Sequence, residues 1–372
     1  MSKKEQRQSE RKGRIAVLQP HVPHYREEFF AKLDTASGGA DIYVYERQQA
    51  VQRQGFSRGA TPVTHLPALS LRGVIMYNPL PLLKGHDVMV LMLHFAHLTT
   101  WLLLLTRFIH RRKIILWGQG ISVKRYLKEE RKADWRLRLM ASMADGLWLY
   151  MDKESSQWRK ILPRKPIVAL GNTLTGVSEM VAYEPPTAID RLKEKYGISQ
   201  PRVVIYCARF NHSYRRADIL VDIIRHSDSA ATAFIIIGDG VEKPDFMPFD
   251  NVHDFGALYD TAVKRELFAI ADVYLQPGWV GLSIVEAMAY GKPVFTMHRS
   301  QTVKQCVEYS YIEPGVNGML FDTAEECAQA IANMPLEQLK SMGNNARTLV
   351  SQHLTVDNMT ANAMTVVDVL RH

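Results

Sequence analysis

Short apolar segments alternate with helix-like segments along most of the chain, and this alternation constrains the fold more than any other feature. In the first half, strand-like runs recur at Arg14–Leu18, Asp41–Tyr45, Asp87–Leu91, Lys113–Trp117 and Leu147–Tyr150. Helical patterns lie between several of them, at Tyr25–Leu33, Leu98–Ile109 and Arg125–Ala144. Strands and helices that alternate at this spacing predict an α/β fold, with a parallel sheet covered by helices on both faces.

The alternation returns after residue 200. The predicted strands are Val203–Ala208, Phe234–Ile237, Val252–Phe255, Val273–Gln276 and Pro293–Thr296. The predicted helices are Ala217–Arg225, Asp260–Ala271 and Ser283–Tyr290. A length of 372 residues suits two domains, and the run Glu184-Pro185-Pro186 marks a break between them. We therefore expect two Rossmann-like, doubly wound domains, 14–185 and 186–355, facing across a cleft, with a basic disordered tail (1–13) before them and a closing helix (356–372) after them.

One apolar run raises the question of a membrane span. Val88 to Leu105 contains no Asp, Glu, Lys or Arg over 18 residues, which is long enough for a transmembrane helix. The run divides into a short strand, a loop with His94 and His97, and a helix, as a buried strand–helix pair does. We favour the buried pair.

Basic residues are concentrated in two stretches of the first half. The net charge is +8, yet residues 1–14 hold six Lys or Arg against two Glu, and residues 107–138 hold eleven against three acidic residues. A solvated helix face and a disordered tail would explain these stretches, and so would attraction to anionic lipid. Nucleic acid is not expected as a partner, because no DNA- or RNA-binding motif accompanies the charge.

Ordinary cofactor and metal sites are not indicated. The loop after the first strand, Gln19–His24, lacks the glycines of a dinucleotide site, and no P-loop pattern occurs. The three cysteines have no zinc-ligand spacing and suit a reducing compartment. The N-terminus has no apolar core of a secretory signal. We expect a cytoplasmic protein without cofactor or bound metal.

Two features of the second half suggest a diphosphate site. Arg209 ends a predicted strand and Arg215 precedes the next helix, so that two guanidinium groups frame one loop and can clamp phosphate oxygens. A glycine-rich turn, Gln276–Gly281, then leads into a helix whose first N–H groups can hold phosphate. Glu286 in that helix can accept the hydroxyls of a ribose, or it can form a capping box with Ser283.

These motifs occur in an order that resembles the donor domain of family 4 glycosyltransferases of the GT-B fold. The resemblance covers residues 203–320 and rests on Ala208-Arg209-Phe210, Arg215, Asp218-Ile219-Leu220, Ile237-Gly238-Asp239-Gly240, Ala271-Asp272-Val273, Pro277, Gly281-Leu282, Glu286-Ala287-Met288-Ala289, Gly291-Lys292-Pro293-Val294 and Glu313–Gly318. Trp117-Gly118-Gln119-Gly120 and Gly171-Asn172-Thr173-Leu174 are similar to members of the family with less specificity.

The resemblance implies the transfer of a sugar from a nucleoside diphosphate sugar with retention of configuration. It assigns donor binding to Arg209, Arg215, Gly238, Gly278, Trp279, Val280, Gly281, Leu282 and Glu286. Arg209 and Arg215 would also be catalytic, stabilising the leaving diphosphate in place of a metal, since no Asp-x-Asp pair occurs. Where the family motif has its first Glu, this chain has Gly278. Trp279 would take over the sugar contact, or the contact and the activity are lost.

The acceptor would bind to the first domain, at residues that follow strands. His21, His24 and Arg26 follow the first strand, His94 and His97 the third, and Gln119 the fourth. We assign catalytic roles to His94 and His24, and acceptor contacts to His21, Arg26 and Gln119. The family often extends lipid-linked sugars of bacterial surface polysaccharides, which implies a glycan acceptor and an enzyme peripheral to the inner face of the plasma membrane.

Two other functions are compatible with these motifs. Gly278 would suit a non-catalytic module that binds nucleotide sugars or glycans. A nucleotide-sugar epimerase would use the same two-domain fold without an acceptor.

Overall fold

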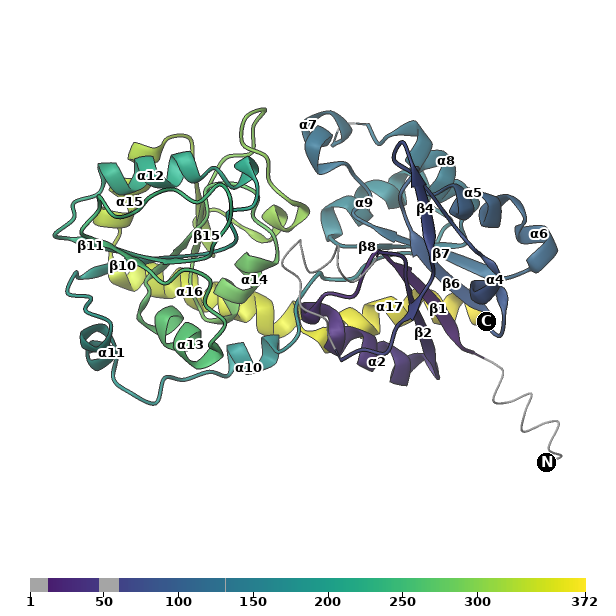
Figure 1. The fold of residues 1–372 in the computed structure, drawn as a ribbon, viewed down its shortest axis with the longest axis horizontal. Helices are drawn as coiled ribbons and strands as arrows, with labels where there is room; N and C mark the ends of the chain where they lie inside the picture. The colour runs from purple at the N-terminus through teal and green to yellow at the C-terminus, as the bar shows by residue number, and fades with distance from the viewer. Residues whose placement is uncertain (1–12, 47–59, 131) are drawn as a thin grey trace. The chain divides into compact units, whose positions relative to one another are not determined.

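The computed structural model describes residues 13–46, 60–130 and 132–372, and all structural statements refer to these residues. Apart from Gly13, the predicted basic tail lies outside them. The chain divides into two compact units (Figure 1). The first unit comprises residues 1–176 and 356–372, and the second comprises residues 177–355. The sequence places the boundary at residue 185, which lies inside the second unit, and it treats the closing helix as a separate piece.

The first unit is built on a seven-stranded sheet whose strands are all parallel. Their order is β3-β2-β1-β6-β7-β8-β9. The strands are β1 (Ile15–Gln19), β2 (Ala40–Val44), β3 (Thr64–His65), β6 (Val88–Met92), β7 (Lys113–Gly118), β8 (Gly146–Leu149) and β9 (Ile167–Ala169). β1, β6, β7 and β8 are almost wholly buried, as expected for a parallel sheet covered on both faces.

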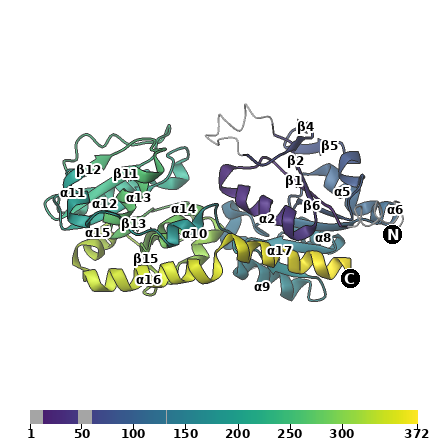
Figure 2. The same ribbon diagram turned by 90° about the horizontal axis from the view of Figure 1, so that it is seen from below.

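Helices cover this sheet. They are α2 (Glu27–Ser37), α4 (Leu80–Leu83), α5 (Leu98–Leu105), α6 (Arg107–His110), α7 (Tyr126–Glu129), α8 (Trp135–Met143), α9 (Asp152–Ile161) and α17 (Val356–Arg371), with 3₁₀ turns η1 (His24–Arg26) and η2 (Val123–Arg125). The last helix, α17, lies beside α2, and Figure 2 shows the pair from below. It also packs on β8 and β9, so the chain's C-terminal helix completes the first unit.

A separate hairpin of β4 (Ala68–Leu71) and β5 (Val74–Tyr77) packs against α5 in the first unit. It does not belong to the parallel sheet.

The second unit is built on a six-stranded parallel sheet in the order β12-β11-β10-β13-β14-β15. Its strands are β10 (Arg202–Cys207), β11 (Thr232–Ile237), β12 (Val252–Asp254), β13 (Val273–Leu275), β14 (Val294–Met297) and β15 (Gly318–Phe321). Its helices are α10 (Val177–Val181), α11 (Ile189–Lys195), α12 (Ala217–His226), α13 (Thr261–Ile270), α14 (Leu282–Ala289), α15 (Ala324–Asn333) and α16 (Leu336–His353), with 3₁₀ turns η3 (Ser213–Arg215) and η4 (Val307–Tyr311). Figure 1 shows α12 and α15 on one side of the sheet, and α13 and α16 on the other.

The α/β architecture and the two doubly wound sheets are confirmed. Both sheets begin with the order 3-2-1-4-5, counted along the chain within each sheet, which is that of a Rossmann fold. One predicted helix, Arg125–Ala144, is wrong, because α7 ends at Glu129 and α8 begins only at Trp135. Asp134 caps α8 by accepting a hydrogen bond from the backbone N–H of Arg136 at 2.8 Å, which favours a new helix start there.

The apolar run Val88–Leu105 forms β6, a loop and α5, as predicted for a buried strand–helix pair. A second helix, α6, follows after Thr106, where a single long helix was expected. Within the described residues, no helix combines the length and apolar character that a membrane crossing needs.

Candidate functional site

The candidate donor site of the second unit lies at the carboxyl ends of β10 and β13. These strands are neighbours in the sheet, although β11 follows β10 in the chain. The loops after β10 and β13 therefore start side by side at the carboxyl ends of these strands and lead to opposite faces of the sheet. Open α/β sheets bind their ligands at such a switch point. The predicted residues Arg209, Arg215 and Gln276–Gly281 all lie on these two loops.

The loop that carries Arg209 packs closely on the turn after β11. A Cβ atom on Gly238 would lie 2.1 Å from the carbonyl oxygen of Ala208, and one on Gly240 would lie 2.5 Å from backbone atoms of Phe210. Both glycines have positive φ, at +149° and +147°. Gly238 is thus needed for backbone packing behind Arg209, which itself is half-buried.

Two buried glutamines hold the turn after β13. The side-chain amide of Gln276 donates to the carbonyl oxygens of Gly278 (3.0 Å) and Trp279 (2.8 Å), and its oxygen accepts from the hydroxyl of Tyr274 (2.7 Å). Gln305 accepts from the N–H of Val280 (2.9 Å) and donates to the carbonyl of Pro277 (3.1 Å). Both glutamines are fully buried, so these bonds fix the turn without competition from water.

Arg215 joins the two loops. It lies at the end of η3, and its Nη1 donates to the carbonyl oxygen of Trp279 at 2.9 Å. The preceding residue, Tyr214, stacks its ring on Trp279, with 4.9 Å between centroids and 18° between planes. Trp279 has a φ of +54°, an unfavourable conformation for a bulky residue. Its surroundings hold it there, as is common at functional sites.

Gly278 stands where the related motif has a carboxylate, and the structure leaves no space for a side chain there. A Cβ atom on Gly278 would lie 2.4 Å from the carbonyl oxygen of Tyr214 and 2.9 Å from the Cγ of Arg216. The glycine is therefore required by the close approach of η3. Trp279 is half-buried beside it, and its ring is the side chain that this turn presents.

The helix α14 begins at the end of this turn, with Gly281 as its N-cap residue and no side-chain cap. Ser283 donates its hydroxyl to Gln276 Oε1 at 2.8 Å, so the capping box considered from the sequence does not form. Gly281 and Leu282 are half-buried and lie where free N–H groups can meet an anion. Val280 is fully buried with its N–H bonded to Gln305, so its predicted role as a direct donor contact does not fit.

Glu286 is paired with a residue that the sequence did not suggest. Its Oε1 lies 2.5 Å from Nζ of Lys264, a residue of α13. Burial alone would lower the pKa of Lys264, but the carboxylate of Glu286 outweighs it and raises this pKa to about 12. Glu286 therefore remains paired with a cation at neutral pH.

In the first unit, the candidate acceptor residues follow neighbouring strands. His21 and His24 follow β1, His94 follows β6, and Gln119 follows β7, and these three strands are adjacent in the sheet. His21 Nδ1 lies 2.8 Å from Glu46 Oε2. His94 is exposed, stacks on Phe95 with 5.4 Å between ring centroids, and accepts from the N–H of Ala96 at 3.3 Å.

Arg26 is a correction to the predicted acceptor site. Its side chain is buried, with 6% of the residue exposed. It donates to Asn172 Oδ1 and, at 3.2 Å, to Sδ of Met359 in α17. The guanidinium also lies 5.9 Å from the ring of Trp117. Arg26 thus links the loop after β1 to residues 172–173 and to α17. This structural role does not fit the predicted contact with an acceptor.

His97 is also structural, and no catalytic role was assigned to it from the sequence. It is 2% exposed, and its Nε2 lies 3.4 Å from the hydroxyl of Tyr45. Burial, with a smaller contribution from His94, lowers the pKa of His97 to about 4.

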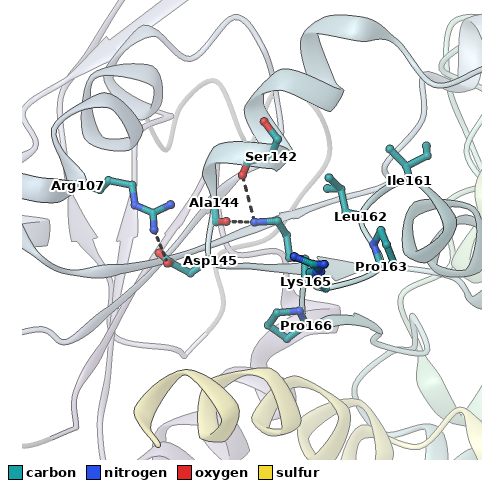
Figure 3. A pocket seen from close by; sticks show the side chains of 10 residues that line it. Arg107, Ser142, Ala144, Asp145, Ile161, Leu162, Pro163, Lys165 and Pro166 are labelled. Carbon is teal, nitrogen blue, oxygen red and sulfur yellow. Dashed lines mark hydrogen bonds and ion pairs between the residues drawn. The ribbon is translucent and has the colours of Figure 1, made fainter.

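A hollow of about 460 Å³ opens at the amino ends of β8 and β9, opposite to the ends where the candidate acceptor residues lie (Figure 3). Lys165 donates there to the carbonyls of Ser142 (3.3 Å) and Ala144, while Arg107 pairs with Asp145 at 3.1 Å. These cations satisfy carbonyl groups at the end of α8. Since ligands of such sheets bind at the carboxyl ends of the strands, we do not assign this hollow to the substrate.

Sequence reasoning missed Tyr214, Lys264 and Gln305. Tyr214 stands directly before the predicted Arg215 and could have been noticed. Gln305 accepts its hydrogen bond from the N–H of Val280, which lies 25 residues earlier in the chain. No local sequence pattern therefore marks Gln305. Among the described residues, no group of three or more His, Cys, Asp or Glu side chains could hold a metal ion.

Known proteins resemble this chain in sequence over part of the second unit and in fold over both units. Residues 201–335 match the family model "Glycosyl transferases group 1". HepE from Anabaena, solved in complex with UDP, is 17% identical with a TM-score of 0.66, covering 96% of this chain and 100% of its own. A glycosyltransferase from Rickettsia africae is 15% identical with a TM-score of 0.63, covering 96% and 98%.

The lipopolysaccharide outer core galactosyltransferase WaaB is 12% identical, with a TM-score of 0.62 and coverage of 95% and 99%. A search of curated protein sequences found no match. The structural likenesses extend over both units, and the family match covers the candidate donor site. The chain therefore has the GT-B fold of these solved structures, and its residues 201–335 are similar to the group 1 glycosyltransferases.

Proposed function

We propose that this protein transfers a sugar from a nucleoside diphosphate sugar to a glycan acceptor with retention of configuration. The observation that carries the proposal is the contact of Arg215 with the turn after β13 at 2.9 Å. It brings a guanidinium group and the N-terminus of α14 to one place, which favours a diphosphate. HepE, which has the same fold, was solved with UDP.

The chemistry follows from where charge develops. As the bond between the anomeric carbon and the diphosphate breaks, positive charge grows on the sugar and negative charge on the leaving phosphate. Arg209 and Arg215 would stabilise the phosphate, together with the N–H groups of Gly281 and Leu282. Preorganised donors of this kind contribute about 3 kcal/mol each. This stabilisation needs no metal ion or cofactor.

Trp279 would form the wall of the sugar site in place of the carboxylate that Gly278 cannot carry. Its ring is fixed by stacking on Tyr214. An aromatic face packs against the C–H side of a sugar rather than against its hydroxyl groups. Glu286, which is paired with Lys264, would accept the ribose hydroxyls.

The acceptor would bind at the carboxyl ends of β1, β6 and β7. His21, His24, His94 and Gln119 would contact it, with His94 and His24 nearest the reacting hydroxyl. We propose a lipid-linked acceptor in the synthesis of a bacterial surface polysaccharide. The protein would work in the cytoplasm, peripheral to the inner face of the plasma membrane, because the basic residues of 107–138 would attract anionic lipid. WaaB is a lipopolysaccharide galactosyltransferase with the same fold.

A panel of nucleotide sugars tests the proposal. The protein is incubated with each donor, and release of the nucleoside diphosphate and the anomeric configuration of the product are followed by NMR. We expect turnover with one donor class and a product of the donor's configuration. Inversion would refute the retaining mechanism, and an isomerised nucleotide sugar without release of diphosphate would show an epimerase.

A second candidate function is a non-catalytic module that binds nucleotide sugars, favoured by Gly278. It predicts saturable binding of one donor, no turnover with any acceptor or with water, and the same affinity before and after prolonged incubation.

A further inference from the structure

The β4–β5 hairpin of the first unit has one face packed and one face exposed. Its antiparallel register pairs Leu69 with Met76 and Leu71 with Val74. Side chains alternate between the two faces of a strand, so these four apolar residues share a face. All four are exposed: the exposed fraction is 74% for Leu69, 44% for Met76, 75% for Leu71 and 39% for Val74.

The opposite face holds the hairpin in place. Tyr77 is 5% exposed, and its hydroxyl lies 2.7 Å from that of Thr100 in α5. The N–H of Ile75 donates to the carbonyl of Ala96 at 2.9 Å. The outer face is thus presented by a fixed element. A solvated hairpin face normally carries polar residues, and an exposed apolar cluster marks a surface that meets another apolar phase.

The hairpin turn places a cation at the tip of this apolar face. The strands are joined by Arg72 and Gly73, both with positive φ, at +50° and +81°. This is the backbone of a two-residue type I′ turn, in which the first position favours Asn, Asp or Gly. Arg72 adopts a conformation that is costly for a residue with a Cβ atom, and such strain is retained where it has a use.

Helices α5 and α6 of the same unit repeat the combination of apolar and basic residues. α5 packs against β5. It exposes Leu98, Leu102 and Leu105 along one side, and α6 exposes Phe108 and Ile109. Residues 98–113 contain four Lys or Arg and no acidic residue. Within this segment the apolar side chains are thus accompanied by cations and by no acidic residue, and one of these cations, Arg107, is paired with Asp145.

We propose that the outer face of the β4–β5 hairpin inserts into the lipid bilayer, with Arg72 at the level of the lipid phosphates. The proposal rests on the membrane association proposed above, and it assigns the affinity to a specific apolar element besides the general positive charge. Apolar side chains enter the boundary between headgroups and acyl chains, and neighbouring cations bind anionic lipid. The absence of acidic residues from 98–113 favours this occupant over a second protein surface.

Co-sedimentation with vesicles tests the proposal. The full chain is mixed with phosphatidylcholine vesicles, with and without phosphatidylglycerol, at low and high salt. The double variant Leu69→Glu/Leu71→Glu is compared with wild type and with Met247→Glu, a control on an apolar residue of the second unit that is 91% exposed. All substituted residues are exposed, so thermal unfolding of the variants should match wild type.

We expect the hairpin variant to lose about tenfold or more of its vesicle partition, and the loss to persist at high salt because apolar insertion is not screened. Met247→Glu should partition like wild type, and donor hydrolysis in solution should be the same for all three proteins. Equal partition of wild type and the hairpin variant would overturn the proposal, even if the protein proves to be a transferase. A wild-type dimer that the double variant dissociates, without vesicle binding, would also overturn it and identify a second copy as the occupant.

Discussion

No side chain fits at Gly278, because the backbone of η3 passes close to it. The carbonyl oxygen of Tyr214 would lie 2.4 Å from a Cβ atom at this position, so any side chain would push η3 away from the turn after β13. The absence of a side chain at position 278 and the stacking of Tyr214 on Trp279 therefore both belong to the close approach of η3 to this turn.

The substitution Gly278→Ala tests this account. We expect it to lower the free energy of unfolding by about 1–3 kcal/mol, since a methyl group must be forced into a packed site. Gly281→Ala is the matched control, because nothing lies within 4 Å of a Cβ there. Urea unfolding of both variants measures the difference. Equal stability of the two would show that the loop after β10 does not press on Gly278.

His97 makes the stability of the first unit sensitive to acid. Burial lowers its pKa to about 4, whereas in the unfolded chain the pKa is about 6.5. Between these values the unfolded state binds a proton and the folded state does not, so the free energy of unfolding falls as the pH falls.

We expect the contribution of His97 to lower the free energy of unfolding below about pH 6.5, by about 3 kcal/mol near pH 4. Urea unfolding of wild type and His97→Gln over this range isolates it, because all other titrating groups are shared. The difference between the two curves should change with pH. A constant difference would mean that His97 titrates alike in both states.

At the scale of elements, much of the fold follows from local pattern. The strands predicted in both halves lie within about two residues of those observed, because buried parallel strands read as short apolar runs. β3, β9 and β15 were not predicted, and neither were the hairpin strands β4 and β5. The attachment of α17 to the first unit was also not predicted, since an amphipathic helix does not reveal which sheet it will cover.

The site was predictable to a similar degree. Arg215 and the turn after β13 were found because arginines and glycines at strand ends carry a physical meaning. The role of the buried Gln305 was not, because its bonds to Val280 and Pro277 connect segments 25 and 28 residues apart. The burial of Arg26 was missed for the same reason, since its partners Asn172 and Met359 lie far along the chain.

The place of α17 leads to a prediction on element packing. Val366 of α17 meets β8 directly, because a Cβ on Gly146 would lie 2.5 Å from its Cγ1. Val366→Ala should destabilise the first unit by about 2 kcal/mol and speed hydrogen exchange in β8 and α2. Val350→Ala in α16 is the counterpart and should act on the second unit alone. If Val366→Ala instead speeds exchange in β10 and β11, the assignment of α17 is refuted.

At the scale of the whole molecule, charge and chemistry are divided between the two units. The strongly basic segment, 107–138, belongs to the first unit, where we propose contact with membrane and acceptor. The predicted diphosphate site belongs to the second unit and depends on few cations. The net charge of +8 therefore describes the proposed docking surface more than the site of catalysis.

The central claim is that Arg215 and the turn after β13 bind a nucleoside diphosphate. Isothermal titration of the full chain with UDP, GDP, ADP and dTDP, in the presence of EDTA, tests it most directly. We expect one diphosphate to bind, and Arg215→Ala to weaken it by about tenfold to a hundredfold, the value of a charged hydrogen bond. Arg225→Ala, on an exposed arginine of α12, should bind like wild type. Failure of wild type to bind any of the four, or equal affinity of Arg215→Ala and wild type, would contradict the account.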